Sequence, residues 1–332
     1  MKLRFVGAGI IALFLVTSVG AAQAGTIDPQ CRNGTPTERA AQDACQKALD
    51  LFTFLAPQLG GAIAGGNAAS GEHSSLRGPG HFSLGVRANI VRARIPEIAQ
   101  HEPVVTGAQA SDYHVEDRTV PVPTLDAAIG IYRGFPVGGT NTMGLDLLVN
   151  LAYLPSFTSD DVDVSISGSS FKVGVGGRLT IVEETFMTPG IVVSYLRRDL
   201  PVINVRATPG NDELRVDDFQ IKTGAWRAVI GKNFSVLGVS VGGGQDRYET
   251  SALAEVTVNS AGLTFEAGPI AAVQELTRDN LFGSLSLNLP LLSVVGELGR
   301  ISNGRLATFN TFGDARADDD LAYASLGLRV RW

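Results

Sequence analysis

The feature that most constrains the fold is an alternation of apolar and polar residues that recurs along most of the chain. In its clearest instance, Leu145, Leu147 and Val149 alternate with Asp146 and Asn150. A period of two is that of a β-strand whose two faces meet different surroundings. The chain is therefore expected to form an antiparallel sheet with one apolar face.

Ten segments show this alternation, and turn or loop residues separate them. They are residues 82–90, 125–131, 145–153, 171–181, 191–198, 219–230, 236–245, 281–289, 291–299 and 321–332. A weaker pair, 252–258 and 263–271, either adds two strands or forms a hairpin standing above a membrane. We expect an all-β fold, an antiparallel transmembrane β-barrel of about 10–12 strands with 14 as the upper limit.

The lengths of the connections favour a membrane barrel over a soluble β-sandwich. Short turns are expected at 231–233 and 288–290, whereas long polar links occupy 96–121, 156–169, 198–215 and 302–320. Short turns on one side and long loops on the other are typical of outer-membrane barrels. Aromatic residues near the expected strand ends suit the two membrane interfaces; they are Tyr153, Phe171, Tyr195, Phe219 and Trp332.

An export signal is expected before the barrel. Lys2 and Arg4 precede an apolar run from Phe5 to Val19, and Ala22-Gln23-Ala24 has the small-x-small pattern of a cleavage site. We therefore divide the chain into a signal peptide (1–24), an N-terminal helical and Gly/Ala-rich periplasmic or plug segment (25–79) and the barrel (80–332). The expected location is the cell outer membrane. The net charge of −6 argues against nucleic-acid binding.

The segment after the signal has the pattern of a short helix. Thr35-Pro36-Thr37-Glu38 is a capping box, and apolar residues recur at helical spacing up to Pro57. Cys31 and Cys45 are the only cysteines, and an exported protein matures where disulfides persist, so we expect one bridge. A metal pair is the alternative, although neither cysteine has a nearby histidine to complete a zinc site.

The last strand, Leu321 to Trp332, alternates up to a terminal aromatic residue. In this it resembles outer-membrane β-barrel proteins, and the resemblance covers residues 80 to 332. It implies that Trp332 is a terminal assembly signal, recognised by the barrel assembly machinery. It also places Trp332 outward at the periplasmic interface, with Arg329 and Arg331 facing the lumen.

Charged residues on the polar face of the expected strands are candidates for the lumen. They are Arg87, Asp126, Asp146, Lys172 and Arg178. Because their signs are mixed, they form either a network of ion pairs that fills the interior or a constriction that selects solutes.

The stretch Gly60 to Gly71 (GGAIAGGNAASG) is similar to the glycine-alanine hatch of fatty-acid channels of the FadL type. The chain departs from that family by having Arg77-Gly78-Pro79-Gly80 where an Asn-Pro-Ala motif is expected. The resemblance implies an N-terminal plug and a hydrophobic or amphipathic cargo.

Histidines beside carboxylates are candidate catalytic groups. The segment Asp112 to Asp117 contains His114 and resembles the His and Asp pairs of omptin proteases, with Asp217-Asp218 as a second pair; a solvated acidic loop is the alternative. Arg300-Ile301-Ser302-Asn303 has arginine where lipid hydrolases of this membrane have the histidine base. No catalytic, cofactor-binding or metal-binding residue is assigned.

The sequence therefore predicts a channel or transporter for small or hydrophobic solutes. A structural or surface-interaction barrel with a closed lumen is the alternative, its acidic loops contacting lipopolysaccharide through divalent cations. An outer-membrane hydrolase is the third hypothesis. Expected partners are outer-membrane lipids, lipopolysaccharide and the assembly machinery.

Overall fold

The computed structural model describes residues 25–32, 36–67, 71–97, 104, 106–154, 156–158, 162–208, 212–260 and 263–332. The export signal and Thr35 of the capping box lie outside the described residues.

The described chain contains a 3₁₀ turn η1 (Pro29–Cys31), one α-helix α1 (Pro36–Ala64) and a large antiparallel sheet. The strands are β1 (Phe82–Pro96), β2 (Val115–Tyr132), β3 (Phe135–Val137), β4 (Thr140–Thr142), β5 (Gly144–Tyr153), β6 (Phe157–Thr158), β7 (Val162–Ser167), β8 (Phe171–Val182), β9 (Gly190–Asp199), β10 (Val202–Ala207), β11 (Glu213–Phe234), β12 (Leu237–Ser260), β13 (Leu263–Asn288), β14 (Leu292–Ser302) and β15 (Leu321–Arg331). No helix in these residues is long and apolar enough to cross a bilayer.

The sheet closes on itself. Its strands pair in the order β1, β2, β5, β8, β9, β11, β12, β13, β14 and β15, and β15 pairs back onto β1 from Ser83↔Arg331 to Val91↔Tyr323. This ring of ten strands is a barrel, as the alternation predicted. Closure leaves no unpaired sheet edge along the ring, which is what a sheet surrounded by lipid requires.

The two faces of the barrel are inverted relative to a soluble protein. Exposed apolar side chains cover the outer face, among them Leu84, Val86, Leu145, Val173, Leu285 and Leu328. Buried polar side chains fill the inner face, among them Asn89, Asp126, Asn150, Arg178, Asp246 and Ser284. Apolar residues outside and polar residues inside are the arrangement of a barrel that spans a membrane.

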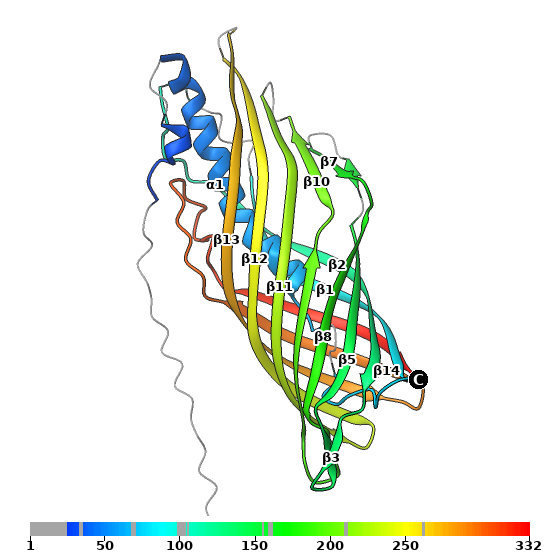
Figure 1. Ribbon diagram of the computed structural model, residues 1–332. Helices are drawn as coiled ribbons and strands as arrows, with labels where there is room; N and C mark the ends of the chain where they lie inside the picture. The colour runs from blue at the N-terminus through cyan, green and yellow to red at the C-terminus, as the bar shows by residue number, and fades with distance from the viewer. Residues whose placement is uncertain are drawn as a thin grey trace, which may run out of the picture.

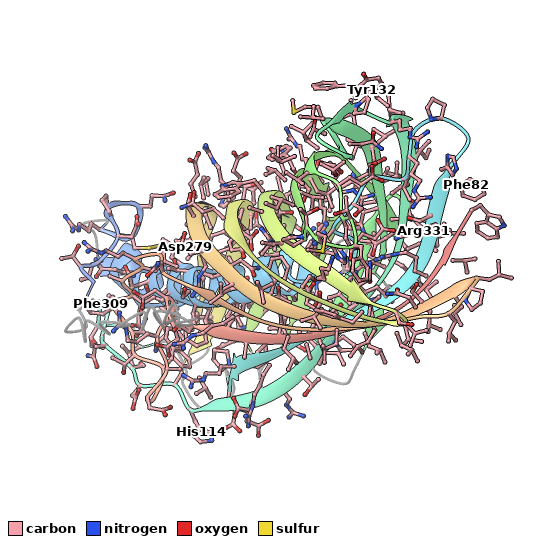
Figure 2. The ribbon with its side chains drawn as sticks, turned by 90° about the horizontal axis from the view of Figure 1, so that it is seen from below. Phe82, His114, Tyr132, Asp279, Phe309 and Arg331 are labelled. Atoms are coloured by element: carbon pink, nitrogen blue, oxygen red, sulfur yellow. A yellow bond between two sulfur atoms is a disulfide. The ribbon has the colours of Figure 1, made fainter. Side chains whose placement is uncertain are left out.

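Aromatic pairs mark both ends of the apolar belt. Phe82 stacks on Trp332 with ring centroids 4.9 Å apart, and Tyr153 lies 5.0 Å from Phe171 at the opposite end. Figure 2 shows Phe82 and Tyr132 at the end of the molecule away from His114 and Phe309. The interpretation of Phe219 as an interface residue is wrong, because its side chain is buried against Ile221 and Ala252.

Several strands continue beyond the belt on the side of the long connections. The weaker pair of segments is the upper part of β12 and β13, which pair continuously from Leu237↔Leu287 to Ser260↔Leu263. It is therefore the hairpin standing above the membrane, and Figure 1 shows these two strands rising past their neighbours. The links predicted at 96–121 and 198–215 are partly strand, since β2 begins at Val115 and β10 pairs with β11. The prolines in β2, at 121 and 123, interrupt the polar-apolar pattern there.

Helix α1 runs inside the barrel (Figure 1). Its first half packs on β12 and β13 beyond the belt, through Ala44 and Ala48 against Val256 and Ile270. Its second half contacts the inner wall around Val91 and Ile301. Residues 25–32 therefore lie at the long-loop end of the barrel, and the chain passes through the lumen to reach β1 at the short-turn end.

The helix continues past Pro57, where the sequence pattern predicted its end. Proline lacks the N–H that would bond the carbonyl of Thr53 four residues earlier. Gln274 on β13 donates its side-chain amide to that carbonyl at 3.2 Å. The barrel wall thus replaces the missing helical hydrogen bond, and α1 extends to Ala64.

Candidate functional site

The C-terminal end of α1 is held by arginines from three strands of the wall. The last carbonyls of a helix lack intrahelical partners and carry partial negative charge, so they attract cationic donors. Arg87 on β1 donates to the Gly65 carbonyl at 3.3 Å and Arg227 on β11 to the Ala64 carbonyl at 3.3 Å. We call Arg87, Arg198 and Arg227 the arginine collar.

Arg198 on β9 makes the largest number of these contacts. Its Nη1 donates to the carbonyls of Ile63 at 2.9 Å and Ala64 at 3.1 Å, and its Nη2 to that of Gly66 at 3.4 Å. Asn89 adds a bond of 2.7 Å to the Ala62 carbonyl. The wall thus binds five consecutive carbonyls at the end of the helix, from Ala62 to Gly66.

Two collar arginines also pair with carboxylates of neighbouring strands. Arg87 Nε lies 2.8 Å from Asp126, and Arg227 Nη1 lies 2.5 Å from Asp246. Arg198 differs, because within the described residues its side chain contacts carbonyl oxygens and forms no ion pair. The helix end supplies the only acceptors that Arg198 has there.

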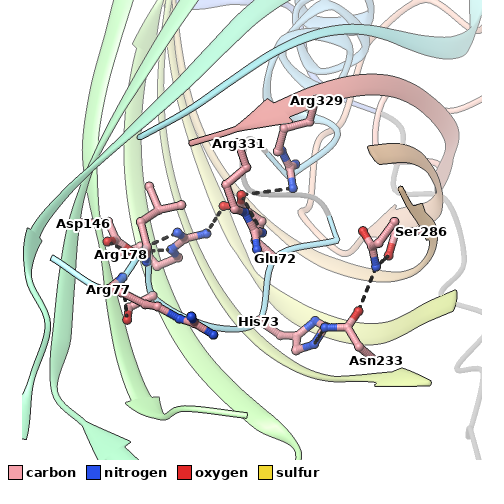
Figure 3. Close-up of polar contacts among 12 residues, drawn as sticks. Glu72, His73, Arg77, Asp146, Arg178, Asn233, Ser286, Arg329 and Arg331 are labelled. Atoms are coloured by element: carbon pink, nitrogen blue, oxygen red, sulfur yellow. Dashed lines mark hydrogen bonds and ion pairs between the residues drawn. The ribbon is translucent and has the colours of Figure 1, made fainter. Parts of the chain in front are cut away.

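A second attachment lies closer to the short-turn end and centres on Glu72. Its carboxylate pairs with Arg178 on β8, with Arg329 at 3.3 Å and with Arg331 at 3.1 Å on β15. Figure 3 shows the three guanidinium groups converging on Glu72. Burial by itself raises the pKa of this carboxyl, but the positive charges of Arg329, Arg178 and Arg331 outweigh it and hold the pKa well below its usual range.

Arg178 also binds a second carboxylate, that of Asp146 on β5. It pairs with Asp146 at 2.8 Å, and the same carboxylate accepts the backbone N–H of Leu76 at 3.1 Å. Arg178, Asp146 and Glu72 are buried, so these three charges are compensated chiefly by one another, whereas Arg331 is more than half exposed.

His73 forms a third attachment, through polar contacts and through the space that two glycines of the wall leave for it. His73 Nε2 lies 2.8 Å from Glu184 Oε2 and 3.1 Å from Asn233 Nδ2. Gly190 and Gly231 leave the space it needs, because a Cβ at Gly190 would lie 2.0 Å from the His73 carbonyl oxygen and one at Gly231 2.6 Å from its Nδ1. A hollow of about 370 Å³ opens beside these residues at the short-turn mouth.

The opposite mouth is covered by the long connections, which are fastened to α1. Asp43 accepts the backbone N–H groups of Val104 at 2.8 Å and Gln109 at 2.9 Å. Asp50 accepts the backbone N–H of Asn310 at 2.8 Å. Phe54 stacks on Phe312 at 4.1 Å, and the predicted disulfide Cys31–Cys45 is present at this end of the helix.

Four of the predicted lumen residues lie buried on the inner wall as two pairs, Arg87 with Asp126 and Arg178 with Asp146. Lys172 lies half-buried on the same face of β8, apart from both pairs, and makes no ion pair in the described chain. Glu72, Arg198 and Arg227 are functional candidates that the sequence did not indicate. The inward face of β11 carries Phe219, Ile221 and Val229 beside Arg227, so the alternation there gives no clear signal for this arginine.

The segment considered for catalysis is engaged in structural contacts. Asp112 accepts hydrogen bonds from Thr311 and Gly313, and Asp117 pairs with Arg92 at 2.9 Å. Asp217 of the proposed second pair binds Arg215 at 2.8 Å. Among the described residues, no group of three or more His, Cys, Asp or Glu side chains is arranged to hold a metal ion.

Comparisons with known proteins give weak likenesses in fold. No protein-family model and no curated protein matches the sequence. The translocator domain of the autotransporter NalP from Neisseria meningitidis is 10% identical, covers 89% of this chain and 99% of its own, and superposes with a TM-score of 0.40. The transport unit of the autotransporter AIDA-I from Escherichia coli is 7% identical, with coverages of 85% and 99% and a TM-score of 0.36. The toluene transporter TodX of Pseudomonas putida is 13% identical, with coverages of 80% and 93% and a TM-score of 0.31.

The strand pairing and the surface of the chain itself define its class. The sheet is closed, its outer face is an apolar belt bounded by aromatic pairs, and its lumen is polar. The strands of the ring pair antiparallel, and the longest connections between them lie at one end. The chain is an outer-membrane β-barrel.

Proposed function

We propose that the protein is a channel that passes small solutes through the barrel lumen, and that residues 36–81 form a plug that must move before it conducts. The observation that carries the proposal is the way the plug is attached. Around the arginine collar, Glu72 and His73, the plug binds the wall through hydrogen bonds and ion pairs. These polar contacts can be exchanged for water when the plug moves. Ile63, Ala64 and Leu76 also pack on apolar wall residues, and these contacts must be exposed on opening.

The space that the plug fills is large enough for a solute. A helix with its side chains is about 10–12 Å across, so its departure leaves a passage of similar width. The lining of that passage is charged around the collar and Glu72. This lining favours polar solutes over the lipophilic cargo that the hatch-like sequence suggested.

Planar-bilayer recording tests the proposal. We compare the chain starting at residue 25 with its Glu72→Gln variant and with a form that lacks residues 25–79. We expect rare openings for the first, more frequent openings for the variant and steady conductance for the shortened form. Glu275→Gln is the control, because Glu275 lies on the exposed outer face.

Heat-modifiable migration on gels verifies that each form has folded into a barrel. If all forms fold and none conducts, the lumen is closed whatever the plug does. The channel is then ruled out.

A surface-interaction barrel is the second candidate, and the cover at the outer mouth favours it. Helix α1, the disulfide and the two longest connections form one packed unit there, through Tyr113 and Phe312. A rigid outer surface over a filled lumen suits contact with other molecules. Absence of conductance together with binding of the barrel to cells or matrix proteins would support this reading.

Lipopolysaccharide remains a proposed partner, and one outward-facing groove fits it. Tyr195 and Trp226 lie at the margin of the belt, and Arg197, Lys222 and Arg247 line the same groove. Aromatic rings beside basic groups suit the boundary between acyl chains and phosphorylated headgroups. The acidic connections offer a second route through divalent cations, as the sequence suggested.

A further inference from the structure

We propose that the arginine collar is the anion-binding site of the open channel, so that the solutes it selects carry carboxylate or phosphate groups. This inference rests on the proposed function, since the collar meets a solute only when the plug has moved. It specifies the chemical class of the small solutes in the proposed function.

The first support is that the arginine side chains of the collar converge on one place. Arg198 Nη1 and Arg227 Nη2 donate to the same oxygen, the Ala64 carbonyl, at 3.1 and 3.3 Å from two different strands. Arg87 reaches the next carbonyl, that of Gly65, from a third strand. The wall therefore directs three guanidinium groups at one small volume, which in the plugged state is filled by acceptor oxygens.

The second support is the charge that the plug leaves behind. At the level of the collar and of Glu72, the wall carries six guanidinium groups and four carboxylates. The guanidinium groups are those of Arg87, Arg178, Arg198, Arg227, Arg329 and Arg331, and the carboxylates are those of Asp126, Asp146, Asp246 and Glu297. The plug contributes the Glu72 carboxylate and the helix-end carbonyls. Without it, six guanidinium groups face four carboxylates between the collar and Glu72, whereas Glu183 and Glu184 lie farther out, in the hollow at the short-turn mouth.

The third support is the chemistry of the groups. A guanidinium binds carboxylate or phosphate through paired, charge-assisted hydrogen bonds, which are stronger than those to a neutral carbonyl. Within the described part of the chain, Arg198 has only carbonyl acceptors in the plugged state, so an anion offers it a stronger partner than the plug does. Exclusion of cations follows from the same excess charge.

Zero-current potentials test this inference. The Glu72→Gln chain is recorded in a KCl gradient, alone and combined with Arg198→Gln or Arg198→Lys. We expect chloride to be preferred over potassium, and we expect Arg198→Gln to reduce that preference about fivefold, the effect of one charge about 4 Å from the permeating ion. Arg198→Lys retains the charge and should retain the preference. Arg206→Gln, at an exposed position on β10 outside the ring, should change nothing.

Inorganic phosphate provides a second measurement. Added to the same recordings, it should reduce the chloride current of the Glu72→Gln chain and have a much weaker effect after Arg198→Gln. A preference for potassium would contradict the anion site but not the channel. The same holds if Arg198→Gln changes neither the ion preference nor the block by phosphate. If the folded barrels never conduct, both the anion site and the channel are ruled out.

Discussion

Glu72 shows how a single side chain can hold a plug. Its three arginine partners come from two strands of the wall, and removing one member of a buried ion cluster leaves the others uncompensated. Such a loss typically amounts to ~3–5 kcal/mol. The attachment is therefore strong enough to close the lumen and local enough to be removed by one substitution.

The depressed pKa of Glu72 predicts how this attachment depends on pH. A carboxyl whose folded pKa lies below its unfolded value stabilises the folded state above that unfolded value, here 4.5, and loses this contribution as the pH falls through the folded pKa. The protection factors of the amides in residues 71–81, which are corrected for the pH dependence of intrinsic exchange, should therefore be unchanged from neutral pH down to about 5 and fall only in stronger acid. In Glu72→Gln, these protection factors should be lower at neutral pH and lack this acid-dependent fall. Loosening of the wild-type segment near pH 6 would contradict the assignment.

Gly190 allows a second test at the residue scale. Alanine at this position would place a Cβ 2.0 Å from the His73 carbonyl oxygen, so the segment around His73 must move away from the wall. Overpacking of this kind costs about 1–3 kcal/mol. We expect faster proteolysis of residues 71–81 with unchanged heat-modifiable migration. Gly296→Ala is the matched control, because a Cβ there meets nothing within 4 Å; equal effects of the two substitutions would refute the steric explanation.

At the scale of elements, the sequence predicts the strands better than the plug. The alternation depends only on which face of a strand meets lipid. It therefore identifies the ten strands of the ring and predicts that Arg87 and Asp126 lie on the faces that point into the lumen. It fails where proline interrupts the pattern, as in β2. Strand positions beyond the membrane are also less regular, since both faces there can meet water.

The plug contacts depend on tertiary structure and have no local signal. The end of α1 meets the arginine collar only because the helix lies at one depth in the lumen, and spacing along the chain does not encode depth. Glu72 lies in a stretch rich in Gly, Ala and Ser, whose composition predicts a connector. Pro57 likewise indicates a helix end, and only the side chain of Gln274 across the lumen explains why α1 continues.

The disulfide should stabilise only the half of α1 that lies at the long-connection end. Cys31 and Cys45 are separated by 14 positions, and a loop of that size typically contributes about 3 kcal/mol. We expect Cys31→Ser with Cys45→Ser to increase hydrogen exchange in residues 25–50 and to leave residues 62–81 protected by the wall. If both parts lose protection equally, α1 and the lower plug form one cooperative unit instead.

At the scale of the whole molecule, the orientation of the plug has a topological consequence. The first described residues lie at the end of the barrel with the long connections, and Gly25 bonds the carbonyl of Thr308 there at 3.0 Å. Long loops of such barrels face the exterior of the cell. The plug therefore enters the lumen from outside, and its head must cross the barrel or the membrane during assembly.

This consequence can be tested on intact cells. A short epitope inserted before Gly25 of the mature chain should bind antibody without permeabilisation, whereas an epitope in the turn at residues 138–139 should bind only after it. The turn lies between β3 and β4 at the short-turn end. The reverse pattern would show that the plug enters from the periplasm.

The central claim is that movement of the plug opens the lumen, and a reversible cross-link tests it most directly. A Cβ at Gly65 would lie 3.5 Å from Cγ of Asn89 and 2.7 Å from the Gly61 carbonyl oxygen, so Gly65→Cys with Asn89→Cys can fasten the end of α1 to β1 with a small shift of the last helical turn. In the Glu72→Gln chain, we expect single-channel openings to disappear when this pair is oxidised and to return on reduction, with Gly65→Cys alone as the control for reduction of the native disulfide. Openings of equal frequency in the oxidised and reduced states, with the cross-link verified, would contradict the account.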